Sequence, residues 1–203
     1  MARAVRVAID MNRTDEALAN AGDAETLDLD EIIISKLADA VRMVEMEAPA
    51  HLLESGHDFS ERVSVYDDGK GYAILPHDFM RLICFRMSDW ERGVYDALSE
   101  TDAEYGLMSS RHRGVSGSAE KPRVAIVRRS EGKVLEFAGS EDGDASCTQA
   151  TYMPYPEIDD DGNIDVAEEC YRAAVYRAVS LTLASVGDQL STTMLEISKG
   201  LLN

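Results

Sequence analysis

The chain lacks long apolar runs. It contains no stretch of about 18 consecutive apolar residues, and its first residues lack the apolar segment and cleavage site of a secretory signal peptide. Cysteine is scarce too: Cys84, Cys147 and Cys170 are widely spaced and form no C-x-x-C pair. This pattern favours neither a disulfide framework nor a zinc knuckle. We therefore expect a soluble protein, made in the cytoplasm, with buried and reduced thiols.

Catalytic patterns are missing as well. No serine lies in a nucleophile elbow, no glycine-rich loop has the phosphate-cradling spacing, and no two histidines share helical metal spacing. His51 and His57 flank Glu54 at a spacing that does not align ligands on one helix face. His77 beside Asp78 is typical of a turn. We expect surface histidines, no enzymatic activity, no cofactor and no bound metal.

Positive charge is in short supply. The sequence has 20 Lys and Arg residues against 38 Asp and Glu residues, which gives a formal net charge of -18. A surface this acidic repels phosphate instead of releasing its counterions, so tight nucleic-acid binding is not expected. The same sign suits a wall along which DNA slides without sticking.

The first quarter of the chain contains a clear helical pattern. Residues 29–47 repeat apolar residues at helical spacing, and Asp28 and Glu31 form a variant capping box at their start. Ahead of them, residues 5–10 alternate in a way that predicts a short strand.

The last 41 residues also predict helix. Residues 173–186 are apolar on more than one face, which indicates a helix at the centre of its own domain or between subunits. Gly187 either kinks this helix or divides it in two. Its end has more apolar side chains than a monomer needs, and we assign them to a partner interface or to packing on the helix at 29–47: Met194, Leu195, Leu201 and Leu202.

The middle of the chain has the texture of β structure. Between residues 59 and 156, short alternating runs are separated by turn residues, with hairpins predicted around 67–70 and 130–132. Residues 96–108 predict one or two helical turns, and the Gly, Ser and Pro content of 109–122 predicts a loop.

Together these patterns predict an α+β fold. We expect a single domain, 1–203, in which the terminal helices form a helical base from residues 1–57 and 157–203. A small antiparallel β-sheet or barrel, the β lobe at 58–156, is inserted between them.

Residues 157–168, EIDDDGNIDVAE, resemble the calcium loop of an EF-hand in spacing. An EF-hand needs a helix before the loop, but Pro154 and Pro156 stand where that helix would be. The favoured interpretation is an acidic turn in which Asp165 caps the following helix and Glu168 completes a capping box.

Two further sites are candidates for an interface. Arg111 and Arg113 concentrate positive charge in a Gly/Ser-rich loop, which suits a phosphate, an acidic partner or, as we favour, ion pairs between subunits. Trp90, the single tryptophan, follows a predicted strand, and the sequence leaves open whether it fills the core or anchors an interface.

The order of these parts resembles the head-to-tail adaptor proteins of tailed phages, most closely the tail-tubular-protein type of short-tailed phages. The motifs that carry the resemblance are Leu75-Pro76-x-Asp78-Phe79-x-Arg81-Leu82, Tyr152-x-Pro154 and the helix start EECYRAAVYRAVSLTLA. The chain departs from the family pattern in its acidic turn at 159–161 and in Gly187.

The resemblance implies a structural, non-catalytic virion protein of the phage neck. In such a connector a homo-oligomeric ring, dodecameric in the family, docks its helical base on the portal protein and carries the next tail or neck protein on its sheet lobe. DNA passes through without specific binding, and the chain is synthesised in the bacterial cytoplasm. The alternative is a monomeric calcium- or ligand-binding module that uses residues 157–168.

Overall fold

The computed structural model describes residues 1–12, 29–54, 56–141, 143–159 and 163–202. They form the α+β fold that the sequence predicts. The chain divides into two compact units. The helical unit consists of Met1–Glu54 with Pro156–Asn203, and the β unit is Ser55–Tyr155.

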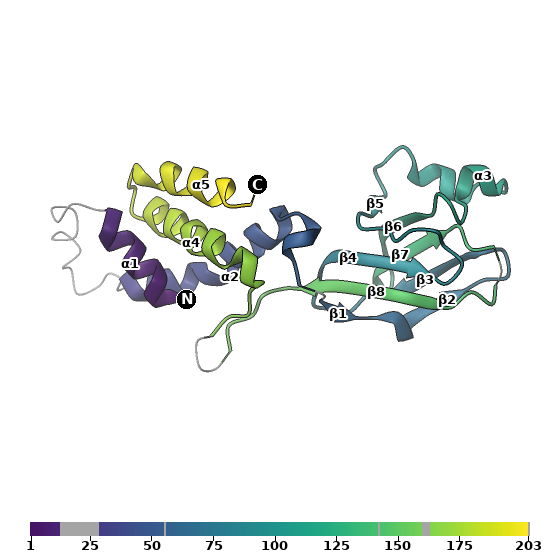
Figure 1. Cartoon of the computed structure of the whole chain (residues 1–203), viewed down its shortest axis with the longest axis horizontal. Coiled ribbons are helices and arrows are strands. Elements are labelled where there is room, and N and C mark those ends of the chain that lie inside the picture. The colour runs from purple at the N-terminus through teal and green to yellow at the C-terminus, as the bar shows by residue number, and fades with distance from the viewer. Residues whose placement is uncertain (13–28, 55, 142, 160–162, 203) are drawn as a thin grey trace. The chain divides into compact units, whose positions relative to one another are not determined.

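In the described residues of the helical unit, α4 is the central helix (Figure 1). Helix α4 packs against each of the other three, and apolar residues all around it are buried. The helix predicted at 29–47 is confirmed with those bounds, and residues 173–186 lie at the centre of their unit. The helices are α1 (Ala2–Asn12), α2 (Leu29–Glu47), α4 (Tyr171–Ser185) and α5 (Leu190–Gly200).

The strand predicted at residues 5–10 is wrong, because these residues belong to α1. Val5 and Ile9 are fully buried and stand four residues apart, which places them on one helix face. Arg6 pairs with Asp10 at the same helical spacing. A short apolar run is ambiguous between periods of two and 3.6, and the alanines of this segment favour helix.

Gly187 divides the last helical segment in two. Its φ of 73° is left-handed, and its N–H donates to the carbonyl of Ala184 while Asp188 donates to that of Leu183. These two bonds form a Schellman motif, which ends α4. The Asp188 carboxylate then accepts a hydrogen bond from the backbone of Leu190, where α5 begins.

The predicted cap of α4 is wrong. Helix α4 begins at Tyr171, after a 3-10 turn, η4, at Glu168–Cys170, so Asp165 does not cap it. The backbone N–H of Ala167, which a capping Asp165 would bind, donates instead to the carboxylate of Glu45 on α2. The capping box predicted at the start of α2 involves Asp28, which lies outside the described residues.

The β unit contains two sheets. Both predicted hairpins are present, as β2–β3 and β6–β7. One sheet is not purely antiparallel, because β5 pairs with β6 in parallel. One sheet has the order β1 (His57–Asp58), β8 (Cys147–Pro154), β4 (Phe79–Met87). The other has the order β2 (Val63–Val65), β3 (Lys70–Ile74), β7 (Gly132–Ala138), β6 (Arg123–Arg129), β5 (Leu98–Ser99).

Short helical turns connect some of these strands. A 3-10 turn, η3, covers Tyr105–Ser109, which agrees with the helical turns predicted near there. The loop predicted at 109–122 also contains the one-turn helix α3, Arg113–Ser116. Two further 3-10 turns are η1, Ala50–Leu52, and η2, Ser60–Arg62.

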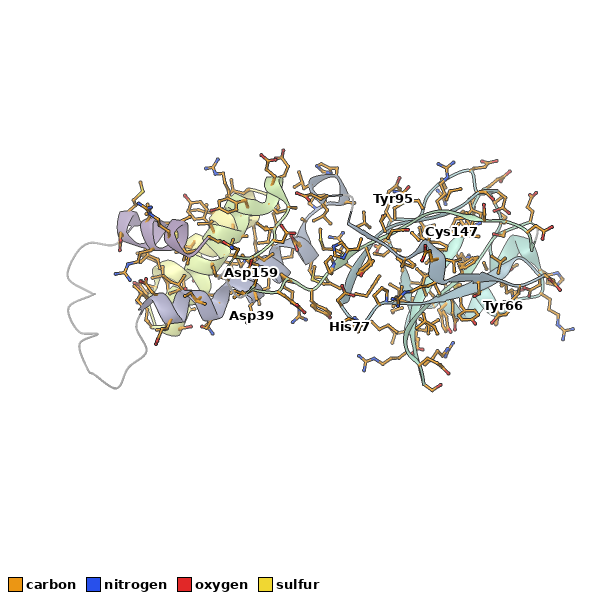
Figure 2. The ribbon with its side chains drawn as sticks, turned by 90° about the horizontal axis from the view of Figure 1, so that it is seen from below. Asp39, Tyr66, His77, Tyr95, Cys147 and Asp159 are labelled. Atoms are coloured by element: carbon orange, nitrogen blue, oxygen red, sulfur yellow. The ribbon has the colours of Figure 1, made fainter. Side chains whose placement is uncertain are left out.

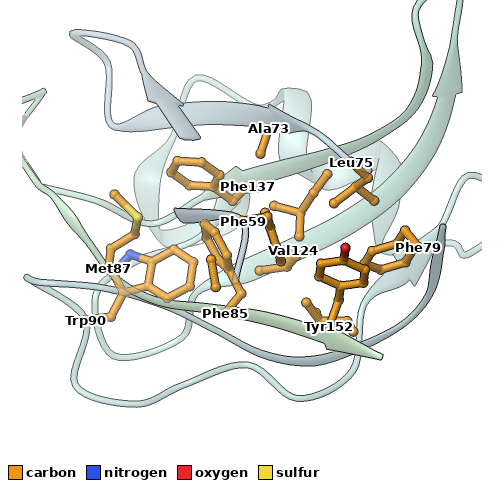
Figure 3. Packing of buried hydrophobic residues seen from close by; sticks show 13 residues of the cluster. Phe59, Ala73, Leu75, Phe79, Phe85, Met87, Trp90, Val124, Phe137 and Tyr152 are labelled. Atoms are coloured by element: carbon orange, nitrogen blue, oxygen red, sulfur yellow. The ribbon is translucent and has the colours of Figure 1, made fainter. Parts of the chain in front are cut away.

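The core of the β unit lies between its two sheets (Figure 3). The ring of Phe85 on β4 contacts several other rings of this core. Its centroid lies 5.0 Å from that of Phe137 on β7 and 5.5 Å from that of Trp90. Phe59 stacks on the same ring at 6.2 Å. Aromatic residues from both sheets therefore fix how the sheets pack.

Candidate functional site

The structure resolves the two interpretations of Trp90. Its side chain is 2% exposed and packs in the core of the β unit, against Phe85 and Phe137. The indole Nε1 has no hydrogen-bond partner among the described residues. Trp90 is a core residue, and its ring offers no surface to a partner.

The other predicted interface residues lie in separate units. Arg111 is exposed in the β unit, and Arg113 begins α3 there, although its side chain falls outside the described part of the chain. In the helical unit, Met194 and Leu202 are buried in core clusters. The side chains of Leu195 and Leu201 are half-buried. The apolar end of the last helix is thus mostly interior, because α5 folds back on α4.

Among the described residues of the helical unit, the most exposed large apolar side chain is on α1. Met11 is 80% exposed, and Val7 one turn earlier is also exposed. They line a groove of about 570 Å³, the α1 groove. Apolar and aromatic residues dominate its lining, which also includes the charged Arg3: Met1, Arg3, Ala4, Val7, Ala8, Met11, Tyr171 and Tyr176. The sequence did not suggest this surface, because residues 5–10 were interpreted as a strand.

The β unit has a second groove, of about 750 Å³, which we call the outer groove. It lies on the face of the five-stranded sheet that points away from the aromatic core, because Tyr72 and Ile74 on β3 alternate with the buried Ala73. Residues of η3 and of the β2–β3 turn complete its lining, including Tyr105 and Tyr66.

A hydrogen-bonded network crosses the outer groove. Arg129 donates to Glu136 through Nε and one amino nitrogen, at 3.0 and 2.6 Å, and that nitrogen also donates to the Tyr105 hydroxyl at 2.8 Å. Tyr105 in turn donates to the other oxygen of Glu136 at 3.0 Å. Burial and the bond to Glu136 raise the pKa of Tyr105, so the phenol stays protonated.

A buried carboxyl group lies in the helical unit. Glu45 on α2 is almost fully buried and accepts a hydrogen bond from the Ala167 backbone at 3.1 Å. Burial raises the pKa of Glu45, and the nearby carboxylates of Asp165 and Glu54 raise it further. The charged form is therefore disfavoured in the folded chain.

Replacing this carboxyl with an amide is expected to stabilise the helical unit at neutral pH. In Glu45→Gln the amide oxygen still accepts the Ala167 N–H, and no charge is buried. Because the pKa of Glu45 is raised, the folded state binds more protons than the unfolded state does. The contribution of this carboxyl to stability is therefore complete below its unfolded pKa and is lost as pH rises through its folded pKa. Thermal unfolding should show a melting temperature a few degrees higher at pH 7, with the difference disappearing near pH 4. A variant less stable than the parent at pH 7 would contradict this account.

The acidic segment 157–168 is preceded by strand β8, not by a helix. Ile158 and Ile164 form an isolated antiparallel bridge, and the Asp159 carboxylate accepts hydrogen bonds from Asn163. Residues 160–162 of this segment lie outside the described residues. Among the described residues, no group of three or more His, Cys, Asp and Glu side chains is placed to hold a metal ion.

The cysteines are free thiols. Cys84 and Cys170 are buried as expected, but Cys147 is only half-buried. Burial raises the pKa of Cys147 to about 11, so its thiol is protonated and unreactive at neutral pH.

None of the helices in the described ranges is long and apolar enough to cross a membrane. No protein-family model matches the chain, and no curated protein matches it. Function is therefore inferred from the residues and their geometry.

Proposed function

We propose that the chain is a non-catalytic structural subunit of a phage virion that assembles into a ring between portal and tail and guides the passage of DNA. The observation that carries this proposal is the apolar α1 groove, with Val7 and Met11 exposed at its surface. In the described part of this acidic chain nothing covers these two side chains, and an exposed apolar surface of this kind is typical of a subunit that associates with others.

A ring needs a heterologous contact, in which one surface of a subunit binds a different surface of the next. The helical unit offers a concave surface in the α1 groove. It also has exposed apolar residues elsewhere, on one face of α2: Met43 and Met46. A contact between these two surfaces of neighbouring copies buries both.

The charge of the chain suits the same role. At a formal net charge of -18, subunits repel one another and repel DNA. Apolar contacts are then expected to supply most of the association energy, beside any local ion pairs such as those proposed for Arg111 and Arg113. Acidic walls around a channel let DNA pass without adhesion, because like charge prevents phosphate contacts.

A single charge in the α1 groove is expected to disrupt assembly. In Val7→Asp a carboxylate would have to be buried in the contact, one helical turn from Arg3, and its desolvation should weaken association by at least about tenfold even if the two charges pair. Mass photometry of the full chain, alone and mixed with the portal protein of its phage, should show multi-copy assemblies, and negative-stain images should show rings. Val7→Asp should shift both samples towards single chains.

Val186→Asp is the matched control, because Val186 is similarly exposed in the helical unit but does not line the α1 groove. It should assemble as the parent does. If the parent chain neither assembles nor binds the portal, the proposal is refuted. A strict monomer that becomes more stable with calcium would support the alternative binding module instead.

A further inference from the structure

We propose that the outer groove of the β unit binds a basic polypeptide segment and holds one of its Arg or Lys side chains against the tyrosines of the groove. This goes beyond the ring role and does not depend on it, because every lining residue belongs to the β unit.

The aromatic residues provide the first part of the site. Tyr66, labelled in Figure 2, is 55% exposed and stacks on Tyr72, with ring centroids 5.7 Å apart and planes inclined by 30°. An aromatic ring carries negative charge on its face, so an exposed tyrosine face attracts a cation. Stacking on Tyr72 holds the Tyr66 ring in place, and little side-chain freedom is left to lose on binding.

The two cations of the groove are already engaged. Lys70 donates to the carbonyl of Ser110 at 3.2 Å. Arg129 makes its bonds to Glu136 and Tyr105. A phosphate or carboxylate ligand would therefore have to compete with Glu136 for Arg129, and Lys70 would offer it only the N–H groups that its bond to Ser110 leaves over.

The acidic side chains of the outer groove outnumber its cations. Three carboxylates line the groove against those two cations. Two of them accept hydrogen bonds from neutral groups: Asp68 from the Lys70 backbone at 3.2 Å, and Glu131 from the Ser130 hydroxyl at 2.7 Å. The Ser130 bond holds the pKa of Glu131 below its usual value, so this carboxylate is ionised at neutral pH. The lining thus attracts cations and repels anions.

The floor of the groove suits the rest of a long cationic side chain. Ile74 is exposed there beside Val134, and Met108 of η3 lines the same space. The methylene stem of Lys or Arg packs on such apolar surface while the charged end stays near carboxylates and rings. A space of about 750 Å³ exceeds what one guanidinium group fills. It fits a short chain segment with more than one side chain.

The test uses the full chain and a hexa-arginine peptide, with a hexa-citrulline peptide as its neutral isostere. Isothermal titration at about 150 mM salt, where charges are screened beyond about 8 Å, limits long-range attraction to the acidic surface. The arginine peptide should bind and the citrulline peptide should not. Tyr66→Leu with Tyr72→Leu should lower affinity for the arginine peptide about fivefold to tenfold, because the variant keeps all charges but loses the aromatic faces.

Tyr95→Leu is the matched control, since Tyr95 is 58% exposed in the β unit but does not line the outer groove. It should bind as the parent does. If the double variant does not fold, the single variant Tyr66→Leu replaces it in the binding test, because it removes only an exposed ring. Equal binding of the citrulline peptide, equal weakening by Tyr95→Leu, unchanged affinity of the folded Tyr66 variant, or no binding by the parent would each overturn the proposal.

Discussion

Phe85→Ala is expected to lower the free energy of unfolding of the β unit by about 3–5 kcal/mol. The side chain of Phe85 is fully buried and contacts rings that come from both sheets. Its removal forfeits the transfer energy of the ring and leaves a cavity between Phe59, Trp90 and Phe137. Among the aromatic rings of the described residues, Phe85 is the one that pairs with all three, so we expect little collapse of the cavity.

The single tryptophan gives this prediction a local readout. Trp90 lies in the same cluster, so its fluorescence reports unfolding of the β unit, while ellipticity at 222 nm is dominated by the helical unit. The fluorescence midpoint in urea should fall sharply in Phe85→Ala. Tyr95→Ala removes an exposed ring from the same unit and should change the midpoint little. A loss below about 1 kcal/mol for Phe85→Ala would mean that the two sheets are not held by this cluster.

Local sequence patterns were sufficient to predict one helix and one hairpin of the fold. The helix at 29–47 was predicted with its observed bounds, because its apolar spacing is regular and Pro49 follows it. The β2–β3 hairpin was predicted from Asp67, Asp68 and Gly69 between two alternating runs. In the structure Gly69 has a φ of 79°, a conformation that glycine adopts without strain.

Features that depend on distant contacts were missed. The segment 5–10 alternates too briefly to separate strand from helix, and only its packing against α4 shows why helix prevails. Asp165 has the sequence of a helix cap, but Glu45, far away in the chain, takes the N–H that the cap would bind. The apolar helix end was assigned to a partner interface or to packing on the helix at 29–47, because sequence alone does not tell that α5 reverses direction after Gly187 and packs on α4.

The two grooves illustrate the same limit. Residues of the outer groove come from β3, η3, the β6–β7 hairpin and β7, so no local motif joins them. Tyr66 and Tyr72 are close in sequence, but the face they share is defined only when β3 pairs with β7. The α1 groove needs α1 as a helix beside Tyr171 and Tyr176 of α4. Surfaces of this kind are properties of tertiary packing.

Glu47→Ala is expected to destabilise the helical unit by about 3 kcal/mol, more than the removal of its partner does. The side chain of Arg177 on α4 is 4% exposed, and its two amino nitrogens donate to Glu47 at 3.0 and 2.6 Å. Its Nε donates to the Ser198 hydroxyl at 3.3 Å, which links α5 to the pair. Without Glu47, a buried guanidinium loses its counter-charge.

The reverse change has a smaller expected effect. In Arg177→Met the buried charge is gone, and Glu47, whose side chain is 45% exposed, returns to water. We expect a loss of about 1 kcal/mol or less, because replacing a buried ion by an apolar side chain of similar length is often nearly neutral. Urea unfolding followed at 222 nm should give this order, and the double variant should resemble Arg177→Met. Equal losses in both single variants would show that the pair acts through packing alone.

The pH dependence provides an independent check of the same pair. The hydrogen bonds from Arg177 lower the pKa of Glu47, so the folded state binds fewer protons than the unfolded state at mildly acidic pH. The contribution of Glu47 is therefore complete above its unfolded pKa and is lost as pH falls through its lowered folded pKa. The difference in stability between the parent and Glu47→Ala should shrink in acid. The effect of Glu45→Gln should also shrink there, but it has the opposite sign at pH 7, where this variant is the more stable one because burial raises the pKa of Glu45. Two carboxyl groups two residues apart on α2 thus respond oppositely to pH, since one faces a buried cation and the other is buried near carboxylates.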